Sequence, residues 1–379
     1  MAARLGWQVV VVERQLQPEV AALDDVPLRV SALNPQSLAL LDQLGVLAPL
    51  RQSTFHPYRQ LEVSEGTQPA ACFSAAEAGD EALGAFVAND QLQALLWQQL
   101  RVHPLIRCCD GQQVRALDNG AEGVRVQLAG GELLEAELLI GAEGGQSQVR
   151  QLAGIPVDGW DYGQHCLALT VALAQNSGDT TWQCFTPAGP RAYLPLWQNQ
   201  ASLVWYDQPL PLRQALNLSD TALVAALRQA YPRPLPELRV LKRALFPLRR
   251  QHAAGYVRQR VVVIGDAAHQ INPLAGLGAN LGFADLALLL ELLARLPLDQ
   301  ALSRLNLWRW PQNLAAMSAM DLCYALFSNQ HPLLQRPRSL ALGLLRDWPQ
   351  LRRLGMKLAA QSWRPTSGWR GRRTQARWR

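Results

Sequence analysis

The chain contains 379 residues, of which 49% are hydrophobic and 17% are charged. This length admits two or three domains with a sizeable core, and the composition excludes a disordered or fibrous chain. The formal net charge is +6, but six of the 36 basic residues are arginines within residues 364–379, so the rest of the chain has 30 basic and 30 acidic residues. Because the basic excess is confined to a tail, the charge does not indicate nucleic-acid binding.

The six cysteines form no C-x-x-C pair. Their spacing indicates neither a zinc site nor a disulfide framework, so we expect no metal site and buried free thiols in a reducing cytoplasm. No signal peptide is visible, and the most apolar expected helix, residues 286–296, is interrupted by Glu291 and Arg295. We therefore expect no membrane-spanning segment.

The first expected elements are a helix end and a strand. Residues 1–5 are predicted to form the last turn of a helix that stops at Gly6. The β-branched apolar run Val9–Val12 predicts a strand buried on both faces, as in the middle of a parallel sheet, and Glu13 ends it. Such a strand is normally reached from an earlier strand through a helix.

Two helices and a hairpin are expected next. Asn34 and Pro35 predict the start of a helix that runs to Gly45, and Asn89 is predicted to cap a second helix. Residues 123–128 alternate between apolar and polar, two glycines turn the chain, and residues 136–140 return. This pattern predicts a β-hairpin.

Three apolar runs end in an acid or a glycine–acid pair: Val9–Val12 before Glu13, residues 138–140 before GAEG, and residues 261–264 before GDAA. Parallel strands whose carboxyl ends open into ligand-binding loops have this form, which predicts a nucleotide-binding α/β sheet. Residues 165–206 read instead as short alternating strands, and Ser219 starts a helix that Pro232 ends. We therefore expect a parallel nucleotide-binding fold interrupted by an antiparallel insert that holds the substrate.

The segment RVVVIGDAAHQINPLAGLGANLGFAD, residues 260–285, carries the most chemistry. Gly265 lets Asp266 lie close to a ligand and accept hydrogen bonds from a sugar-like hydroxyl. Pro273 is expected to rigidify the turn, and Gly276 and Gly278 leave space for a flat ligand against the backbone. The segment therefore predicts a binding loop for a flat ligand that carries a sugar-like chain.

The helix that starts near Asn280 points its positive end at the same ligand. GLGANLG is not a dinucleotide-binding fingerprint, because its third glycine falls one place late and the strand ends well before it. His269 could serve as a base, although a loop histidine more often satisfies local hydrogen bonds.

Two motifs resemble those of a known family. GDAAHxxxPxxGxGxN is similar to the second flavin motif of the aromatic-ring hydroxylases built on the p-hydroxybenzoate hydroxylase fold, and GAEGGQSQVR (residues 141–150) resembles their GADGxxSxVR motif. Residues 181–206 and 320–329 resemble the ubiquinone-biosynthesis branch. The resemblance covers residues 1 to about 357.

The resemblance implies FAD as cofactor and NAD(P)H as co-substrate. The implied cofactor contacts are Glu13, Arg29, Asn89, Glu143, Gly265, Asp266, Pro273, Gly276, Leu277, Gly278 and Asn280. Among them, Glu13 matches the acid that holds the adenosine ribose, and Asp266 matches the contact to the ribityl chain. Glu143 replaces the family's usual aspartate, and Leu277 stands where the branch often has a polar residue.

The resemblance also divides the chain. Residues 1–55, 86–158 and 252–330 match the FAD-binding domain, residues 56–85 and 159–251 match the substrate domain, and residues 331–379 are C-terminal helices and a basic tail. The family's first strand, its GxGxxG loop and most of the following helix have no counterpart, so Met1 is most simply an internal methionine or a misplaced start. We expect the sheet to lack its first strand, and the chain as given to bind FAD weakly.

The implied function is hydroxylation of a polyprenylated benzoquinol or phenol in ubiquinone biosynthesis, through reduced flavin and a C4a-hydroperoxide. The implied setting is the cytoplasm, with peripheral contact to the inner membrane and other ubiquinone-biosynthesis proteins as partners. Leu194, Leu196 and Trp205 are expected to line apolar walls that exclude water, and no catalytic residue can be chosen. A non-catalytic or scaffold member of the assembly, and a flavin isoprenoid reductase on the same fold, are the alternatives.

Overall fold

The computed structural model describes residues 2–16, 26–66, 69–272, 274–329, 331–350 and 352–353. The helices (α) and 3-10 turns (η) are η1 (Ala2–Leu5), α1 (Pro35–Gln43), α2 (Leu47–Ser53), α3 (Ala75–Ala78), α4 (Asn89–Arg101), α5 (Gln148–Leu152), α6 (Pro209–Leu216), α7 (Asp220–Ala230), η2 (Gly265–Ala267), η3 (Leu274–Gly276), α8 (Leu277–Leu293), α9 (Leu298–Phe327) and α10 (Pro332–Asp347). The strands are β1 (Val9–Glu13), β2 (Val30–Leu33), β3 (Phe55–Tyr58), β4 (Gln60–Glu65), β5 (Ala71–Ser74), β6 (Gly84–Ala88), β7 (Ile106–Asp110), β8 (Val114–Asn119), β9 (Val124–Leu128), β10 (Leu133–Ala136), β11 (Leu139–Gly141), β12 (Val157–Leu173), β13 (Thr180–Phe185), β14 (Arg191–Leu196), β15 (Gln200–Asp207), β16 (Leu238–Ala253), β17 (Val257–Arg258), β18 (Val261–Val263) and β19 (His269–Gln270).

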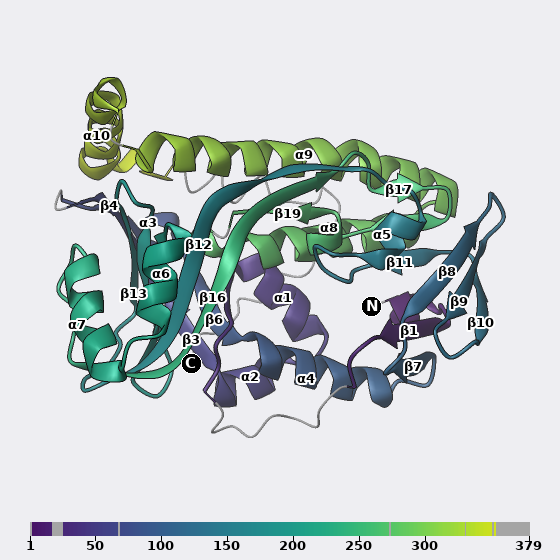
Figure 1. Ribbon diagram of the computed structural model, residues 1–379. Helices are drawn as coiled ribbons and strands as arrows, with labels where there is room; N and C mark the ends of the chain where they lie inside the picture. The colour runs from purple at the N-terminus through teal and green to yellow at the C-terminus, as the bar shows by residue number, and fades with distance from the viewer. Residues whose placement is uncertain are drawn as a thin grey trace.

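The parallel strands of the nucleotide-binding side lie in two separate sheets (Figure 1). β1 pairs with β7, and β11 pairs with β18. Within the described residues β1 has no second strand neighbour, which confirms the expectation of an incomplete sheet. The prediction that Val9–Val12 is buried on both faces is wrong, because Val10 is 43% exposed. With one strand neighbour, and with a cavity along the strand, its side chains are only partly covered.

The expected hairpin is present as β9 and β10, which pair as antiparallel neighbours. Its second strand ends at Ala136, and the residues after it turn away to form β11 in the sheet of β18. The sequence pattern predicted one returning strand over residues 136–140, because only two residues separate the end of β10 from the start of β11.

An eight-stranded sheet forms the substrate side, in the order β19-β16-β12-β15-β14-β13-β4-β5. β12 to β15 are the strands expected within residues 165–206, and they pair as antiparallel neighbours. β13 also pairs with β4 in parallel. β12 and β16 are 17 and 16 residues long, and Figure 1 shows them curving from the nucleotide-binding side across the molecule.

The expected domain boundaries do not coincide with the ends of the strands. Boundaries at 158/159 and 251/252 fall inside β12 and β16, which pair along most of their length. The boundary at 55/56 falls inside β3, which pairs with β6 in a three-stranded sheet with β2. Since continuous strands cross each boundary, the two parts of the fold share their backbone hydrogen bonds.

Two helix starts agree with the sequence and one does not. Asn34 caps α1 by accepting a hydrogen bond from Ser37 N at 2.8 Å, and Ser219 caps α7 through Ala222 N at 3.3 Å. Asn89 is already the first residue of α4 and makes no capping hydrogen bond. Its side chain is therefore available to the neighbouring cavity.

The helices cover both sides of the fold. α8 packs against α9, the longest helix, which lies along one edge of the molecule in Figure 1. α6 and α7 cover one face of the eight-stranded sheet, where residues such as Leu169, Leu203 and Trp205 form the largest buried cluster. None of the described helices combines the length and apolar character needed to cross a membrane.

Candidate active site

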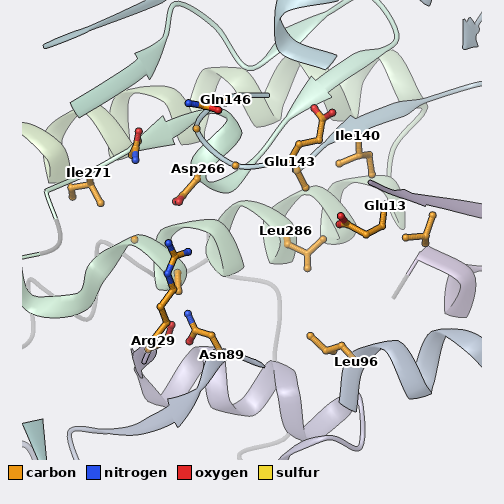
Figure 2. Close-up of a pocket in the computed structure, with 18 of the residues that line it drawn as sticks. Glu13, Arg29, Asn89, Leu96, Ile140, Glu143, Gln146, Asp266, Ile271 and Leu286 are labelled. Atoms are coloured by element: carbon orange, nitrogen blue, oxygen red, sulfur yellow. The ribbon is translucent and has the colours of Figure 1, made fainter. Parts of the chain in front are cut away.

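A cavity of about 2340 Å³ lies where the small parallel sheets, α8 and the eight-stranded sheet meet. Cavities that bind one drug-sized ligand are about 300–1,000 Å³, so this one has space for more than one such molecule. Figure 2 shows part of its wall, with Asp266, Arg29 and Asn89 on one side and Glu13 and Glu143 on the other. Residues far apart in the sequence thus meet around one space.

Asp266 follows the buried strand β18 in the turn η2. The preceding Gly265 has a positive φ of 57°, which favours glycine. The Asp266 carboxylate is accessible from the cavity, yet protein atoms surround it. This burial raises its pKa, while the nearby charges of His269 and Arg29 act in the opposite direction. Within the described residues this carboxylate has no hydrogen-bond partner, so it is free to accept one from a ligand.

The glycine turn at the start of α8 forms the adjoining wall. Gly276 has a φ of 62°, and a Cβ added there would lie 2.9 Å from the Ala32 Cβ. Gly278 also lines the cavity, and a Cβ there would lie 3.9 Å from Asp266 Oδ1. The first turn of α8 therefore presents backbone to the cavity beside Asp266, with the positive end of the helix dipole.

Leu277 and Asn280 of the same turn face away from the cavity. Leu277 packs against the cluster that contains Met317 of α9. The Asn280 Oδ1 accepts hydrogen bonds from Asn34 N at 2.9 Å and Ser37 Oγ at 2.8 Å. Its Nδ2 donates to Ala32 O at 2.7 Å. The Asn280 side chain therefore holds α8 against β2 and α1, and only its backbone belongs to the helix terminus.

The remaining expected residues divide between the cavity wall and its support. Glu13 lines the cavity at the end of β1. Asn89 Oδ1 is buried without a partner, and Arg29 points toward Asp266 in Figure 2. Gly265 supports the turn from behind, donating from its backbone N to Asp285 Oδ2 at 3.1 Å. Pro273 lies outside the described residues.

Glu143 lines the cavity but also caps a helix. Its Oε2 accepts hydrogen bonds from Ser147 Oγ at 2.5 Å and from Val149 N at 2.9 Å. Ser147 in turn accepts from Arg150 N at 3.1 Å. The carboxylate thus stabilises the start of α5.

A buried polar network supports η2 from below. The Asp285 carboxylate contacts His269 Nε2 at 2.5 Å and accepts from Arg309 Nε at 2.7 Å and Asn313 Nδ2 at 2.9 Å. Burial acts to raise the pKa of Asp285, but His269, Arg309 and Asn313 outweigh burial and lower it to about 2. His269 is fully buried and does not line the cavity. Its role is to position the turn that carries Asp266.

The network continues to a second histidine. Asn313 Nδ2 donates to Tyr256 Oη at 3.0 Å, and His252 Nε2 lies 2.9 Å from the same hydroxyl. Burial, with the nearby His269 and Arg250, lowers the pKa of His252 to about 4. His252 also stacks on Trp310, with ring centroids 5.3 Å apart. These contacts join β16 to α9.

The sequence did not single out several residues of the wall. Gln251 and Gln270 are paired neighbours on β16 and β19 and line the cavity together. Gln251 Oε1 is buried without a partner. No sequence signal marks this pair, because the two strands meet only in the tertiary fold. Asp285 did carry a signal, since it is a lone aspartate in an apolar helix.

The expected apolar walls are only partly correct. Leu194 lines the cavity. Leu196 is fully buried in a cluster with Phe86 and Trp197. Trp205 lies on the opposite face of the sheet, against α6 and α7, while its neighbour Val204 lines the cavity. Successive strand residues face opposite sides of a sheet. The prediction therefore placed Trp205 on the cavity wall, whereas Val204 lines the cavity and Trp205 belongs to the core.

Together these features fit a cofactor of the FAD type. A flat ring can lie against the glycine turn, and hydroxyl-bearing chains can reach the accepting carboxylates of Asp266 and Glu13. The buried unpartnered oxygen of Asn89 points to a ligand donor that the described residues do not supply. The cavity wall thus suits an elongated ligand with polar groups at both ends.

Comparison with known proteins agrees with this geometry. The family model described as "FAD binding domain" matches residues 2–306. The 3-demethoxyubiquinol 3-hydroxylase of Escherichia coli (strain K12) is 40% identical, with 94% of this chain and 93% of that protein covered. Ubiquinone hydroxylase UbiL of Rhodospirillum rubrum is 32% identical, covering 94% and 85%.

Among solved structures, p-nitrophenol 4-monooxygenase PnpA from Pseudomonas putida DLL-E4 superposes with a TM-score of 0.77 at 19% identity, covering 95% of this chain and 92% of that one. At that identity the likeness shows the fold alone. The family match over most of the chain and the 40% identical relative carry the assignment. The chain therefore belongs to the FAD-binding monooxygenase family.

Proposed function

We propose that this protein is an FAD-dependent monooxygenase that hydroxylates a polyprenylated benzoquinol in ubiquinone biosynthesis, with NAD(P)H as co-substrate. The substrate favoured is 2-polyprenyl-3-methyl-6-methoxy-1,4-benzoquinol, because the 40% identical relative is named a 3-demethoxyubiquinol 3-hydroxylase. The observation that carries the proposal is the continuity of the cavity. One space joins the Asp266 turn to the inner face of the eight-stranded sheet.

In this proposal the cofactor is held along the wall already described. Glu13 accepts hydrogen bonds from the ribose hydroxyls, and Asp266 accepts hydrogen bonds from the ribityl hydroxyls. Asn89 Oδ1 accepts a hydrogen bond from a donor group of the cofactor. Arg29 adds positive charge beside Asp266, and the backbone of Gly276 and Gly278 faces the flat ring. When bound, FAD supplies the activation of dioxygen and the transfer of one oxygen atom to an electron-rich ring.

The chain itself contributes orientation and dryness. The sheet face of the cavity is lined mainly by apolar residues, among them Ala168, Ala192, Leu194 and Val204. Tyr58 and Phe86, stacked with centroids 4.7 Å apart, line the cavity from the three-stranded sheet. A wall of this kind excludes water and suits a neutral prenylated ring better than a carboxylated one.

The test uses the FAD-loaded protein with NADH or NADPH and demethoxyubiquinol analogues with short prenyl tails. We expect oxygen uptake that matches formation of the hydroxylated quinol, with one labelled atom incorporated from ¹⁸O₂. Reduction of a prenyl double bond without oxygen uptake would favour the reductase alternative. An FAD-loaded protein that turns over neither kind of substrate would favour the scaffold alternative.

We extend the proposal to peripheral contact with a lipid surface, and to other ubiquinone-biosynthesis proteins as partners. Leu340 and Leu344 are spaced four residues apart on one face of α10, Trp348 follows directly after the helix, and the three side chains are 65%, 40% and 56% exposed. On its other side α10 is anchored by Arg338, whose Nε donates to Glu65 Oε1 at 2.6 Å. We expect Leu340→Ser with Leu344→Ser to reduce flotation with phosphatidylglycerol/phosphatidylethanolamine vesicles. Equal flotation of both proteins would contradict the membrane contact.

A further inference from the structure

Ser202 places a hydroxyl on the cavity side of the eight-stranded sheet, on the same strand as Tyr206, which also lines the cavity. It lies in β15, is 3% exposed, and lines the cavity. Within the described residues its hydroxyl has no hydrogen-bond partner. Because this hydroxyl borders the cavity, it is available to form a hydrogen bond with a ligand there.

Two neighbouring threonines have hydroxyls that form hydrogen bonds within the protein. Thr170, paired with Ser202 across β12 and β15, donates to Pro27 O at 2.5 Å. Thr181 of β13 donates to Tyr193 O at 2.9 Å. Both are buried and both are satisfied by a backbone carbonyl. Ser202, between them in the sheet, is not.

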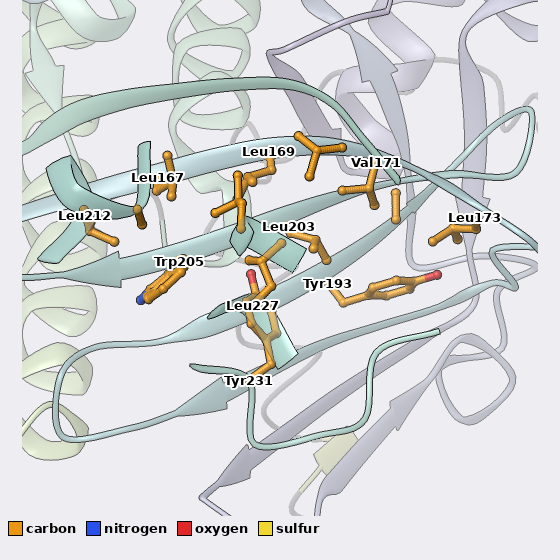
Figure 3. Close-up of a cluster of buried hydrophobic side chains, with 14 residues drawn as sticks. Leu167, Leu169, Val171, Leu173, Tyr193, Leu203, Trp205, Leu212, Leu227 and Tyr231 are labelled. Atoms are coloured by element: carbon orange, nitrogen blue, oxygen red, sulfur yellow. The ribbon is translucent and has the colours of Figure 1, made fainter. Parts of the chain in front are cut away.

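The surroundings of Ser202 leave space for a ring. Two residues along β15, Val204 pairs with Ala168 on one side and with Ala192 on the other, and all three line the cavity. The opposite face carries the large side chains: Leu169, Leu203 and Trp205 pack against α6 and α7, as Figure 3 shows. The cavity face beside Ser202 thus carries the smaller side chains of Ala168, Ala192 and Val204, and Ser202 supplies a hydroxyl.

We propose that the Ser202 hydroxyl forms a hydrogen bond with a ring hydroxyl of the quinol substrate and seats the ring on the floor made by Ala168, Ala192 and Val204. This inference rests on the proposed function. It assigns Ser202 as a residue that contacts and orients the substrate, and it deepens the substrate class to a neutral ring bearing a free hydroxyl. The bond fixes which ring carbon faces the cofactor, so its loss uncouples NAD(P)H oxidation from hydroxylation.

The experiment compares Ser202→Ala with Thr181→Val in the FAD-loaded protein. Three quantities are measured: kcat/KM for the quinol, the fraction of NAD(P)H oxidation released as hydrogen peroxide, and the thermal midpoint. For Ser202→Ala we expect kcat/KM to fall about tenfold and peroxide release to rise, with FAD content and thermal midpoint unchanged. For Thr181→Val, whose side chain also borders the cavity, we expect a lower midpoint, because the Tyr193 carbonyl loses its donor, and a smaller rise in peroxide release than in Ser202→Ala.

A second substrate makes the assignment specific. The quinol monomethyl ethers block one ring hydroxyl at a time, and the wild-type protein should discriminate against one of them more than Ser202→Ala does. Ser202→Thr, which keeps the hydroxyl, should recover part of the coupling. Unchanged coupling in Ser202→Ala, or a loss of midpoint equal to that of Thr181→Val, would overturn the inference.

If the proposed function is wrong, the experiment gives a different result. In that case the wild-type protein would not hydroxylate the quinol at all, and the comparison would rest on quinol binding, followed by the change in flavin absorbance. Weaker binding in Ser202→Ala would then still support the contact, and equal binding in both proteins would overturn it.

Discussion

At Asp266 an accessible but desolvated carboxylate lies at the end of a buried strand, and its pKa is raised by burial. A raised pKa means that the folded protein disfavours the charged form, so the charge does not stabilise the fold. We expect Asp266→Ala to weaken FAD binding by about 10–150-fold, the equivalent of a charged hydrogen bond of roughly 1.5–3 kcal/mol. The thermal midpoint of the FAD-free protein should not fall. Titration of the FAD-free protein with FAD measures the first, and calorimetry measures the second.

Asp266→Asn is the matched control, because it keeps the size and one accepting oxygen. Its FAD affinity should fall between those of the wild type and Asp266→Ala. Equal affinity in all three proteins would remove Asp266 from the cofactor site.

His252 makes stability depend on pH. Its pKa is lowered from 6.5 to about 4 in the folded protein, so the unfolded chain takes up its proton first. The free energy of unfolding should therefore decrease as pH falls from 6.5 to 4, by up to roughly 3 kcal/mol. His252→Phe, which keeps an aromatic ring beside Trp310, should flatten this part of the profile in urea denaturation.

The further decrease expected below pH 4 has a different source and should remain in His252→Phe. Asp285, with a pKa lowered to about 2, stabilises the fold above pH 3.8 and loses this effect as pH falls toward 2. The exposed His331, changed to Gln, is the control and should leave the profile unchanged. A profile in His252→Phe that matches the wild type between pH 6.5 and 4 would contradict the assignment.

Single residues could be found from the sequence where a motif fixes the backbone. Asp266 and the Gly276 turn lie on the cavity wall because glycine conformation and strand end dictate the local path. Asn280 was expected to contact the cofactor, yet its side chain bonds to Asn34, Ser37 and Ala32. Those partners lie almost 250 residues away in the chain, so a local sequence pattern cannot predict them.

At the scale of elements, α5 links one side of the cavity to the other. Ser147 caps the helix through Arg150 N, and the Arg150 guanidinium donates to Ala267 O at 2.7 Å in η2. Ser147→Ala should destabilise the protein by about 1–2 kcal/mol, as for other lost helix caps. Because α5 holds the turn of Asp266, FAD affinity should fall as well.

Leu152→Gln, at a position of the same helix that is 38% exposed and outside the cavity wall, is the control and should change neither quantity. The midpoint of guanidinium unfolding and the dissociation constant of FAD are the measurements. A stability loss in Ser147→Ala with unchanged FAD affinity would show that α5 does not support η2.

The elements themselves were largely predictable and their partners were not. The alternating pattern of residues 165–206 gave four strands that the structure contains. It could not give the parallel pairing of β13 with β4, because parallel neighbours come from distant parts of the chain. Nor could it decide which face Trp205 occupies, since parity depends on where the sheet packs.

For the whole molecule, the cavity joins sheets that otherwise share few contacts. FAD bound there should stabilise the fold by about 2.7 kcal/mol at a hundredfold excess over its dissociation constant. Hydrogen exchange should slow on addition of FAD in β2, in residues 141–149 and in the first turn of α8 together. α6 and α7, which cover the opposite face of the sheet, should be protected less than these three regions. Protection limited to one of the three regions would contradict binding across the junction.

The two faces of the eight-stranded sheet have a consequence for how this protein can change over generations. On β14 and β15, side chains that face the cavity alternate with side chains that face α6 and α7. A substitution at Ala192, Ser202 or Val204 alters what the ligand meets and leaves the packed core beneath it in place. Mutations that broaden or redirect the accepted ring can therefore accumulate without loss of the folded state. The alternation thus separates the residues that meet the ligand from the residues that hold the fold together.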